Sequence, residues 1–243
     1  MRKINVIAMA GSGQRFLDQN YITPKPLIII KRKPMFYYAA KSLPLSKKII
    51  FICKKQLNFI HKLKFFIKKF FKSRKIIEIR KKTNGQATTC KLASKYLRND
   101  DIVTYGSCDY FYKFNRKQFN QLINSNDLIV FVHKPMKTNI MNFKDYGWVK
   151  KGKKNAIQKI QCKNKVSKNP KNNLVITGTF TFKNKKIFHH SYKNMVKEID
   201  KINNEYYMDT VAKHAILLKY KVKYILVKNF KSYGTPSELK KND

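Results

Sequence analysis

The N-terminal segment joins a short apolar run to two closely spaced glycines. Ile4–Met9 predicts a buried β-strand, and Gly11 and Gly13 follow it almost at once. Glycines placed after a strand allow backbone N–H groups to approach a ligand closely, which suits phosphate oxygens. Because ligands collect at the carboxyl edge of the strands in open α/β sheets, we expect this loop to border a ligand site.

Short apolar runs alternate with helical patterns through the N-terminal half of the chain. This alternation predicts βαβ units and a mainly parallel sheet. Further strands are expected at Lys48–Cys53, Ile76–Ile79, Ile102–Tyr105 and Leu128–Val132. Helices are expected over Pro34–Leu43, over the stretch after Gln56, and after Gly85 with an inner face of Ala87, Cys90, Ala93 and Leu97.

The stretch after Gln56 combines an apolar stripe at helical spacing with many lysines. A basic amphipathic helix of this kind can lie on a membrane surface. We favour the alternative, in which the apolar stripe packs on the sheet and the lysines face water.

The pattern becomes β-rich beyond Tyr146. Strands are predicted at Gly147–Val149, Ala156–Gln161, Leu174–Phe182 and Val222–Val227, and helices around Lys185–Ile199 and Tyr206–Leu218. With no internal repeat and no low-complexity linker, residues 1–243 read as one α/β domain. We therefore expect a doubly wound, mainly parallel sheet with a β-rich C-terminal half.

The charge of the chain is extreme. It carries 54 basic residues against 13 acidic ones, a formal net charge of +41. Such an excess can indicate binding to nucleic acid or to an anionic membrane. However, 47 of the basic residues are lysines and seven are arginines, the residue preferred for bidentate contacts with phosphates and bases. We therefore favour compositional drift of surface positions and expect no nucleic-acid partner.

Neither the cysteines nor the hydropathy pattern points to export or to a membrane span. Cys53, Cys90, Cys108 and Cys162 lie far apart and show no paired metal-type spacing, so they read as reduced thiols. Uncharged apolar runs stay well short of the roughly 20 residues of a membrane helix. The N-terminus does not resemble a signal peptide. These features predict a cytoplasmic protein.

Two cations follow the glycine loop. Arg15 comes two residues after Gly13, and Lys25 lies between two prolines in Pro24-Lys25-Pro26. An arginine can fork two phosphate oxygens, and a rigidly held lysine can place a point charge near an α-phosphate. Both charges would stabilise the pentacoordinate transition state and the leaving pyrophosphate of a nucleotidyl transfer. The alternative for either residue is an ordinary surface cation.

Asp109 follows the predicted strand Ile102–Tyr105 and so falls at the same sheet edge. A carboxylate at this position is a candidate to hold Mg²⁺ between two phosphates. Its structural alternative is the N-cap of a helix.

A series of short motifs runs through nearly the whole chain. They are Ala10-Gly11-x-Gly13-x-Arg15-Phe16, Pro24-Lys25-Pro26-Leu27, Gly85-x-Ala87, Asp109, Tyr146-Gly147, Lys163, Thr177-Gly178-Thr179-Phe180, Asn204-Glu205-Tyr206-Tyr207 and Gly234-Thr235-Pro236-Ser237-Glu238-Leu239. In these motifs and in their order the chain resembles the sugar-phosphate nucleotidyltransferases, in particular the branch found in capsule and lipopolysaccharide biosynthesis.

The resemblance implies a Rossmann-like fold of the glycosyltransferase-A type, with a nucleotide-binding half over residues 1–135 and an acceptor-binding half over 136–243. It also implies roles for individual residues. The triphosphate would lie on the loop of Ala10, Gly11, Ser12 and Gly13, and the base beside Gly85 and Ala87. Arg15 and Lys25 would act on the transferring phosphate, and Asp109 would bind Mg²⁺. The acceptor would meet Lys163, Gly178 and Glu205.

Two departures from the family pattern concern the acceptor and the metal. Many members carry Glu-Lys where this chain has Cys162-Lys163, so a contact to a sugar hydroxyl is absent. Many also carry a second metal-binding aspartate at the position of Ser232. Either Asp109 and the phosphates hold the metal alone, or Asp209 substitutes, or activity is weak.

The resemblance implies that a nucleoside triphosphate is joined to a sugar-1-phosphate, giving an NDP-sugar and pyrophosphate for surface polysaccharide biosynthesis. A cytidylyltransferase acting on phosphocholine or another small phosphorylated alcohol or amide remains an alternative. An alternative of another class is a basic nucleic-acid-binding protein whose nucleotide site is vestigial. That protein would bind nucleic acid with a steep dependence on salt.

Overall fold

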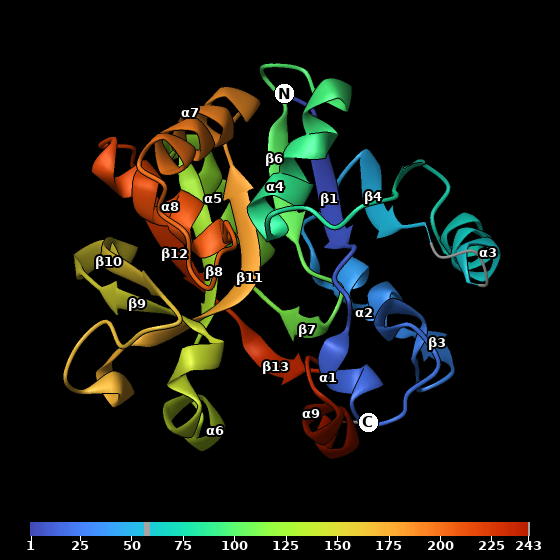
Figure 1. The fold of residues 1–243 in the computed structure, drawn as a ribbon. Helices are drawn as coiled ribbons and strands as arrows, with labels where there is room; N and C mark the ends of the chain where they lie inside the picture. Colours follow the sequence, from blue (N-terminus) through green and yellow to red (C-terminus); the bar gives the residue numbers. More distant parts are fainter. Residues whose placement is uncertain (56–58, 243) are drawn as a thin grey trace.

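The computed structural model describes residues 1–55 and 59–242 and shows a large mixed sheet with helices on both faces (Figure 1). One path through this nine-stranded sheet runs β10-β9-β11-β6-β1-β4-β5, and β8 and β12 extend from β11. The strands of the large sheet are β1 (Lys3–Met9), β4 (Lys48–Lys54), β5 (Arg74–Ile79), β6 (Ile102–Gly106), β8 (Leu128–His133), β9 (Gly147–Lys151), β10 (Ile157–Cys162), β11 (Leu174–Phe182) and β12 (Val222–Leu226).

The strands of the N-terminal half pair in parallel. β1 lies between β4 and β6, with Val6 opposite both Ile50 and Tyr105, and β5 adds to β4. These strands are apolar because both faces of this part of the sheet are covered. Their carboxyl ends therefore meet at one edge, as the sequence predicts.

The strand β11 changes the direction of the sheet. It runs antiparallel to β6, β8 and β9, and its register shifts between Ile176 and Phe180, around Gly178. β12 pairs in parallel with β8, and β9 pairs antiparallel with β10. The predicted α/β class is confirmed. The parallel strand pairs lie in β5-β4-β1-β6 and in β8-β12.

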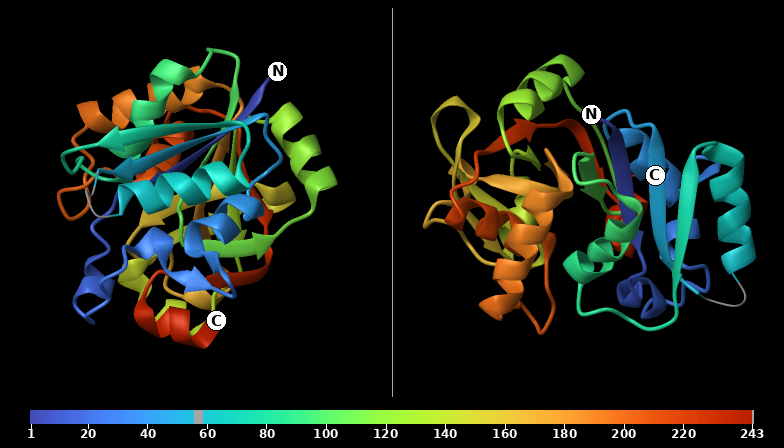
Figure 2. Two further views of the ribbon diagram at one scale, coloured as in Figure 1. Left: turned by 90° about the vertical axis from the view of Figure 1, so that its right-hand side faces the viewer. Right: turned by 90° about the horizontal axis from the view of Figure 1, so that it is seen from above.

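Two layers of helices enclose the sheet, as the view from above shows (Figure 2). The helices α4 (Gln86–Lys91), α7 (Lys185–Lys197) and α8 (Met208–Leu217) pack on the face that carries Val6 and Val130. The opposite face, which carries Ile7 and Phe131, is covered by α2 (Met35–Ser42), α3 (Ile60–Phe70) and α5 (Arg116–Ser125).

The helix α3 packs on the sheet, as the sequence predicts. It buries Ile60, Leu63 and Ile67 and leaves Lys62 and Lys68 exposed. Gln56, where the predicted segment starts, lies outside the described residues. Among the helices that the structure describes, none is long and apolar enough to cross a membrane.

Several short elements were not predicted. Besides α5, they are α1 (Gln14–Leu17), β2 (Ile29–Ile30), β3 (Lys33–Pro34), β7 (Tyr110–Lys113), α6 (Lys137–Met141), β13 (Lys228–Ser232) and α9 (Pro236–Asn242). β7 and β13 form a separate antiparallel pair in which Ser232 lies opposite Tyr110. This pairing brings the C-terminal segment to the residues that follow β6, and Tyr233 N–H donates to the Asp109 carbonyl at 2.8 Å.

A buried carboxylate fixes the amino ends of β1 and β6. Asp101 is fully buried and accepts hydrogen bonds from Arg2 Nε at 2.8 Å, Arg2 Nη2 at 2.7 Å and Arg98 N–H at 2.7 Å. Burial alone would raise the pKa of Asp101, but these donors outweigh it and hold the pKa below 3.8. The contact joins residues that are 99 positions apart.

We expect Asp101→Asn to destabilise the protein most at neutral pH. A carboxylate whose pKa is lower in the folded state contributes its stability above the unfolded-state pKa and loses it as the pH falls through the folded value. The difference in free energy of unfolding between wild type and variant, measured with urea at several pH values, should therefore shrink below about pH 4. A difference that stays constant with pH would contradict this role of Asp101.

Candidate active site

The carboxyl ends of β1 and β6 border a cavity of about 240 Å³. Ala10, Gly11 and Gly13 line one side of it, and Gly85 and Gln86 line another. These are the segments that the sequence assigns to the nucleotide. Of the other residues that the resemblance assigns to the nucleotide, Ser12 lines a neighbouring hollow, and Ala87 is fully buried next to the lining residue Gln86.

The glycine loop is shaped by its backbone. Gly13 has φ +70° and caps the short helix α1, whose Phe16 N–H donates to the Gly13 carbonyl at 2.8 Å. Phe16 is buried and anchors the loop. No neighbouring heavy atom described in the structure lies within 4 Å of where a Cβ on Gly11 would be, so this backbone faces open space. A ligand oxygen can therefore approach the loop closely.

The glycine at position 85 is required by a close backbone approach. Gly85 has φ +103°, and a Cβ there would lie within 3 Å of backbone atoms of Tyr206. Ala87 N–H donates to the Tyr206 carbonyl at 3.0 Å, and Tyr206 N–H donates to the Asn84 carbonyl at 2.9 Å. The loop that borders the first cavity is thus fixed to the segment of Glu205 and Tyr207.

Lys25 and Asp109 form an ion pair at the floor of the cavity. Lys25 starts the 3₁₀ turn η1 (Lys25–Leu27), and its Nζ lies 2.6 Å from Asp109 Oδ2 and 3.1 Å from the Gly234 carbonyl. The side chains are 18% and 13% exposed. Nζ also lies 5.6 Å from the centre of the Phe16 ring. Residues 84 positions apart are held together in this way.

Both groups of the pair are charged at neutral pH. Burial favours the neutral form of each, but the attraction between them outweighs it, so the pKa of Lys25 is raised and that of Asp109 is lowered. Asp109 Oδ1 is buried and has no hydrogen-bond partner among the described residues. An oxygen in that state is ready to accept a ligand or a cation.

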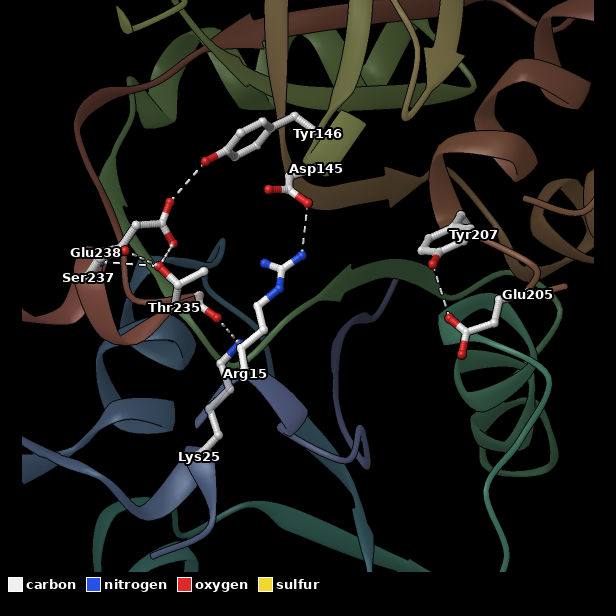
Figure 3. Close-up of polar contacts among 10 residues, drawn as sticks. Arg15, Lys25, Asp145, Tyr146, Glu205, Tyr207, Thr235, Ser237 and Glu238 are labelled. Carbon is white, nitrogen blue, oxygen red and sulfur yellow. Dashed lines mark hydrogen bonds and ion pairs between the residues drawn. The ribbon is translucent and has the colours of Figure 1, made fainter. Parts of the chain in front are cut away.

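Arg15 points away from Lys25 (Figure 3). Its Nη2 lies 3.0 Å from Asp145 Oδ1, and both side chains are about half exposed. The structure therefore does not bring Arg15 and Lys25 to one point. A surface pair of this kind is weak and can be exchanged for a phosphate.

A second cavity of about 210 Å³ adjoins the first and shares Gln86, Ser107, Asp109 and Tyr207 with it. Lys163 and Gly178, which the sequence resemblance assigns to the acceptor, both line it. The Lys163 Nζ lies 4.7 Å from the centre of the Tyr207 ring. Gly178 has φ +75° at the irregularity of β11 and allows close approach to Tyr110.

Glu205, which the sequence resemblance assigns to the acceptor, lines the first cavity next to Tyr207, a residue that lines both. It pairs with Lys82 Nζ at 2.8 Å and accepts a hydrogen bond from the Tyr207 hydroxyl at 3.1 Å (Figure 3). Burial alone would raise the pKa of Glu205. The interactions with Lys82 and Tyr207 outweigh this effect, so the pKa lies below its ordinary value. Tyr207 lines both cavities and thus lies between them.

The oxygen atoms that these residues offer suit a hard cation that is held chiefly by the phosphates of a bound substrate. Asp109 offers a free carboxylate oxygen, whereas Ser232 is buried and its hydroxyl accepts from Gly234 N–H at 3.3 Å. Within residues 1–55 and 59–242 no cluster of three His, Cys, Asp or Glu side chains could hold a metal. Mg²⁺ commonly binds through one or two carboxylates plus substrate phosphates and water, so Asp109 fits that mode.

Some lining residues were not singled out from the sequence. Lys82 is one of 47 lysines and carries no local signal, and Asp145 gains meaning only through its contact with Arg15. Ser107 could have been found, because it lies two residues before Asp109 at the same strand end. Tyr207 belongs to a quoted motif but had no assigned role.

The family follows from the sequence profile described as Nucleotidyl transferase, which matches residues 4–224. The chain belongs to the nucleotidyl transferase family. The predicted enzyme class, a nucleotidyltransferase, is thereby confirmed. Comparison with curated proteins gives no sequence match.

Solved structures of nucleotidyltransferases share this fold. The nucleoside-diphosphate-sugar pyrophosphorylase of Vibrio cholerae RC9 has a TM-score of 0.82 and 20% identity, covering 98% of each chain. The inositol-1-phosphate CTP transferase of T. maritima has a TM-score of 0.74 and 15% identity, covering 98% of this chain and 91% of the other. The UTP-bound UGPase of Acinetobacter baumannii has a TM-score of 0.74 and 17% identity, covering 100% of this chain and 92% of the other.

We expect Lys25→Ala to lower turnover by orders of magnitude and to destabilise the protein by about 3 kcal/mol, because it leaves the buried Asp109 without its cation. The double variant Lys25→Ala with Asp109→Asn should regain much of the stability and none of the activity. Turnover and urea unfolding of the two variants separate these effects. Near-normal turnover of the single variant would contradict the assigned role of Lys25.

Proposed function

We propose that the protein joins a nucleoside triphosphate to a sugar-1-phosphate and releases pyrophosphate, giving an NDP-sugar. The observation that carries this proposal is the pair of adjoining cavities that share Asp109. One cavity borders the glycine loop and the other contains Lys163, so each offers donors or a cation to a phosphate. Their junction supports transfer between two phosphorylated ligands.

The chemistry we assign to the junction is direct in-line displacement. A phosphate oxygen of the acceptor attacks the α-phosphorus, a new P–O bond forms, and the bond to the bridging oxygen of the β-phosphate breaks. The electron pair of that bond leaves with pyrophosphate. The attacking group belongs to the acceptor, so the protein need supply no nucleophile, and catalysis is positioning and charge stabilisation.

In this reaction Lys25 leaves Asp109 and places its ammonium beside the α-phosphate, where negative charge grows. The glycine loop holds the triphosphate through backbone N–H groups, and Arg15 exchanges Asp145 for phosphate oxygens. Lys163 holds the acceptor phosphate, while Gly178 leaves room for the acceptor beside Tyr110. Glu205, with Tyr207, orders the border between the two ligands.

We assign Mg²⁺ as the metal, with Asp109 as its protein ligand. When bound, the ion would neutralise charge on the phosphates and favour departure of pyrophosphate. Asp109 is free to take this role once Lys25 has turned to the phosphate. Because Ser232 carries no carboxylate, phosphate oxygens and water would supply the other ligands of the ion.

The cellular setting we propose is the cytoplasm, with the NDP-sugar serving surface polysaccharide biosynthesis. The four cysteines are free thiols and all are buried, which agrees with a reducing compartment. The biosynthetic role rests on the sequence resemblance alone.

One observation favours a different acceptor. Cys162 stands where many relatives have a glutamate, and Tyr110, Tyr146 and Tyr207 line the second cavity. Aromatic rings can bind a quaternary ammonium, so phosphocholine or a related small phosphorylated compound is the second candidate acceptor. The reaction would be the same.

We expect pyrophosphate release to require Mg²⁺, one nucleoside triphosphate and one sugar-1-phosphate together. The assay tests each triphosphate against a panel of sugar-1-phosphates, with phosphocholine as a separate arm and Lys163→Ala as a variant that should need more acceptor. Release with phosphocholine alone would replace the acceptor that we propose. Silence with every pair, together with tight, salt-sensitive binding of DNA or RNA, would contradict the enzymatic assignment and favour a nucleic-acid-binding protein.

A further inference from the structure

We propose that Asp209 binds a hydroxyl group of the acceptor and so selects among phosphorylated acceptors. The inference rests on the proposed function and assigns a further residue to its acceptor cavity. It concerns the end of the acceptor away from the phosphate that Lys163 would hold.

The position of Asp209 is set by a helix and a glycine. Asp209 is the second residue of α8 and lines the second cavity. Its Oδ2 occupies the space that a Cβ on Gly147 would take, so the glycine of β9 leaves room for this carboxylate. The side chain is therefore held against the cavity wall by backbone.

Three carboxylates line this cavity, and Asp209 differs from the other two. Asp109 is paired with Lys25 and Asp145 with Arg15. For Asp209, the part of the chain that the structure describes offers no basic side chain within 4.0 Å. The thiol of Cys162, a weak donor, lies close enough to lower the pKa of Asp209.

Asp209 is half-buried, and a carboxylate with so weak a partner can accept further hydrogen bonds. Burial raises the pKa of Asp209 to about 6, and the Cys162 thiol and the charge of Lys163 offset only part of this. The group is thus mostly ionised at pH 7, and it lines the second cavity. A ligand hydroxyl supplies the missing hydrogen bond without bringing in a second charge.

The neighbouring residues explain why this carboxylate is needed. Cys162 takes the place of a glutamate that would contact a sugar hydroxyl in many relatives, and burial raises its pKa far above neutrality, so it stays a neutral thiol. Cys162 and Asp209 both line the second cavity, and the charge of Asp209 contributes to the raised pKa of the Cys162 thiol. Asp209, at the start of α8, then supplies the carboxylate that the end of β10 lacks.

The chemistry of the cavity favours a phosphorylated, hydroxyl-bearing acceptor. Lys163 supplies one cation for a phosphate, and the tyrosine rings offer flat apolar surfaces for the faces of a sugar ring. Asp209 then discriminates by a hydrogen bond, which a buried polar group enforces strongly because an analogue that lacks the hydroxyl leaves it unpaired.

We expect Asp209→Asn to raise the KM for the acceptor at least about tenfold and to leave the KM for the triphosphate within about twofold. In the wild type the acceptor KM should rise more steeply below about pH 6 than in the variant, where the acceptor phosphate still titrates but the side chain at position 209 does not. Glu198→Gln, an exposed acid-to-amide change at the end of α7, serves as the matched control and should behave as wild type.

A second measurement uses only the unaltered protein and covers the case in which the variant fails to fold. The wild type is assayed with monodeoxy analogues of the active sugar-1-phosphate. For one analogue its KM should rise about as much as the KM for the full acceptor rises in Asp209→Asn. In the variant, where it folds, the KM for that analogue should be no higher than the KM for the full acceptor.

The outcomes separate the two proposals. If a sugar-1-phosphate supports release but Asp209→Asn and all deoxy analogues keep the wild-type KM, the role of Asp209 is wrong and the proposed function stands. If no sugar-1-phosphate supports release by the wild type, the proposed function fails, and the inference that rests on it fails as well.

Discussion

The ion pair of Lys25 and Asp109 connects the parts of the molecule on which the site depends. Lys25 belongs to the segment after the glycine loop, Asp109 to the end of β6, and the Gly234 carbonyl that also accepts from Lys25 belongs to the C-terminal segment. Taking two charges out of water is costly, and removal of one partner leaves the other uncompensated. This cost agrees with the role in phosphate binding that we propose for Lys25.

The two cavities arise from the change of strand direction at β6. On one side of β6 the parallel strands end at the glycine loop, and on the other the antiparallel β11 carries the irregularity at Gly178. Residues at the carboxyl end of β6, including Ser107 and Asp109, consequently line both cavities. The backbone hydrogen bonds between the Gly85 loop and Tyr206 fix the wall of the first cavity to the segment that carries Tyr207, which lines both.

The sequence predicted the sheet well because its buried strands are unbroken apolar runs. It did not predict β7, which has three aromatic residues followed by a lysine, or β13, which is mostly polar, because neither shows a strand-like alternation of apolar and polar residues. Their pairing nevertheless brings the C-terminal segment to Asp109. Lys25 and Asp109 were each predicted as site residues, but their contact could not be inferred across 84 positions. The pairing of Arg15 with Asp145 and the placement of Glu205 beside the first cavity depend on tertiary contacts that carry no local signal.

The most direct test is a crystal structure of the protein with Mg²⁺ and a nonhydrolysable analogue of the triphosphate that supports turnover. We expect the phosphates on the glycine loop, the Lys25 Nζ moved from Asp109 to the α-phosphate, and Asp109 facing the metal. A complex in which Lys25 remains on Asp109, with the triphosphate bound away from the first cavity, would contradict the site described here.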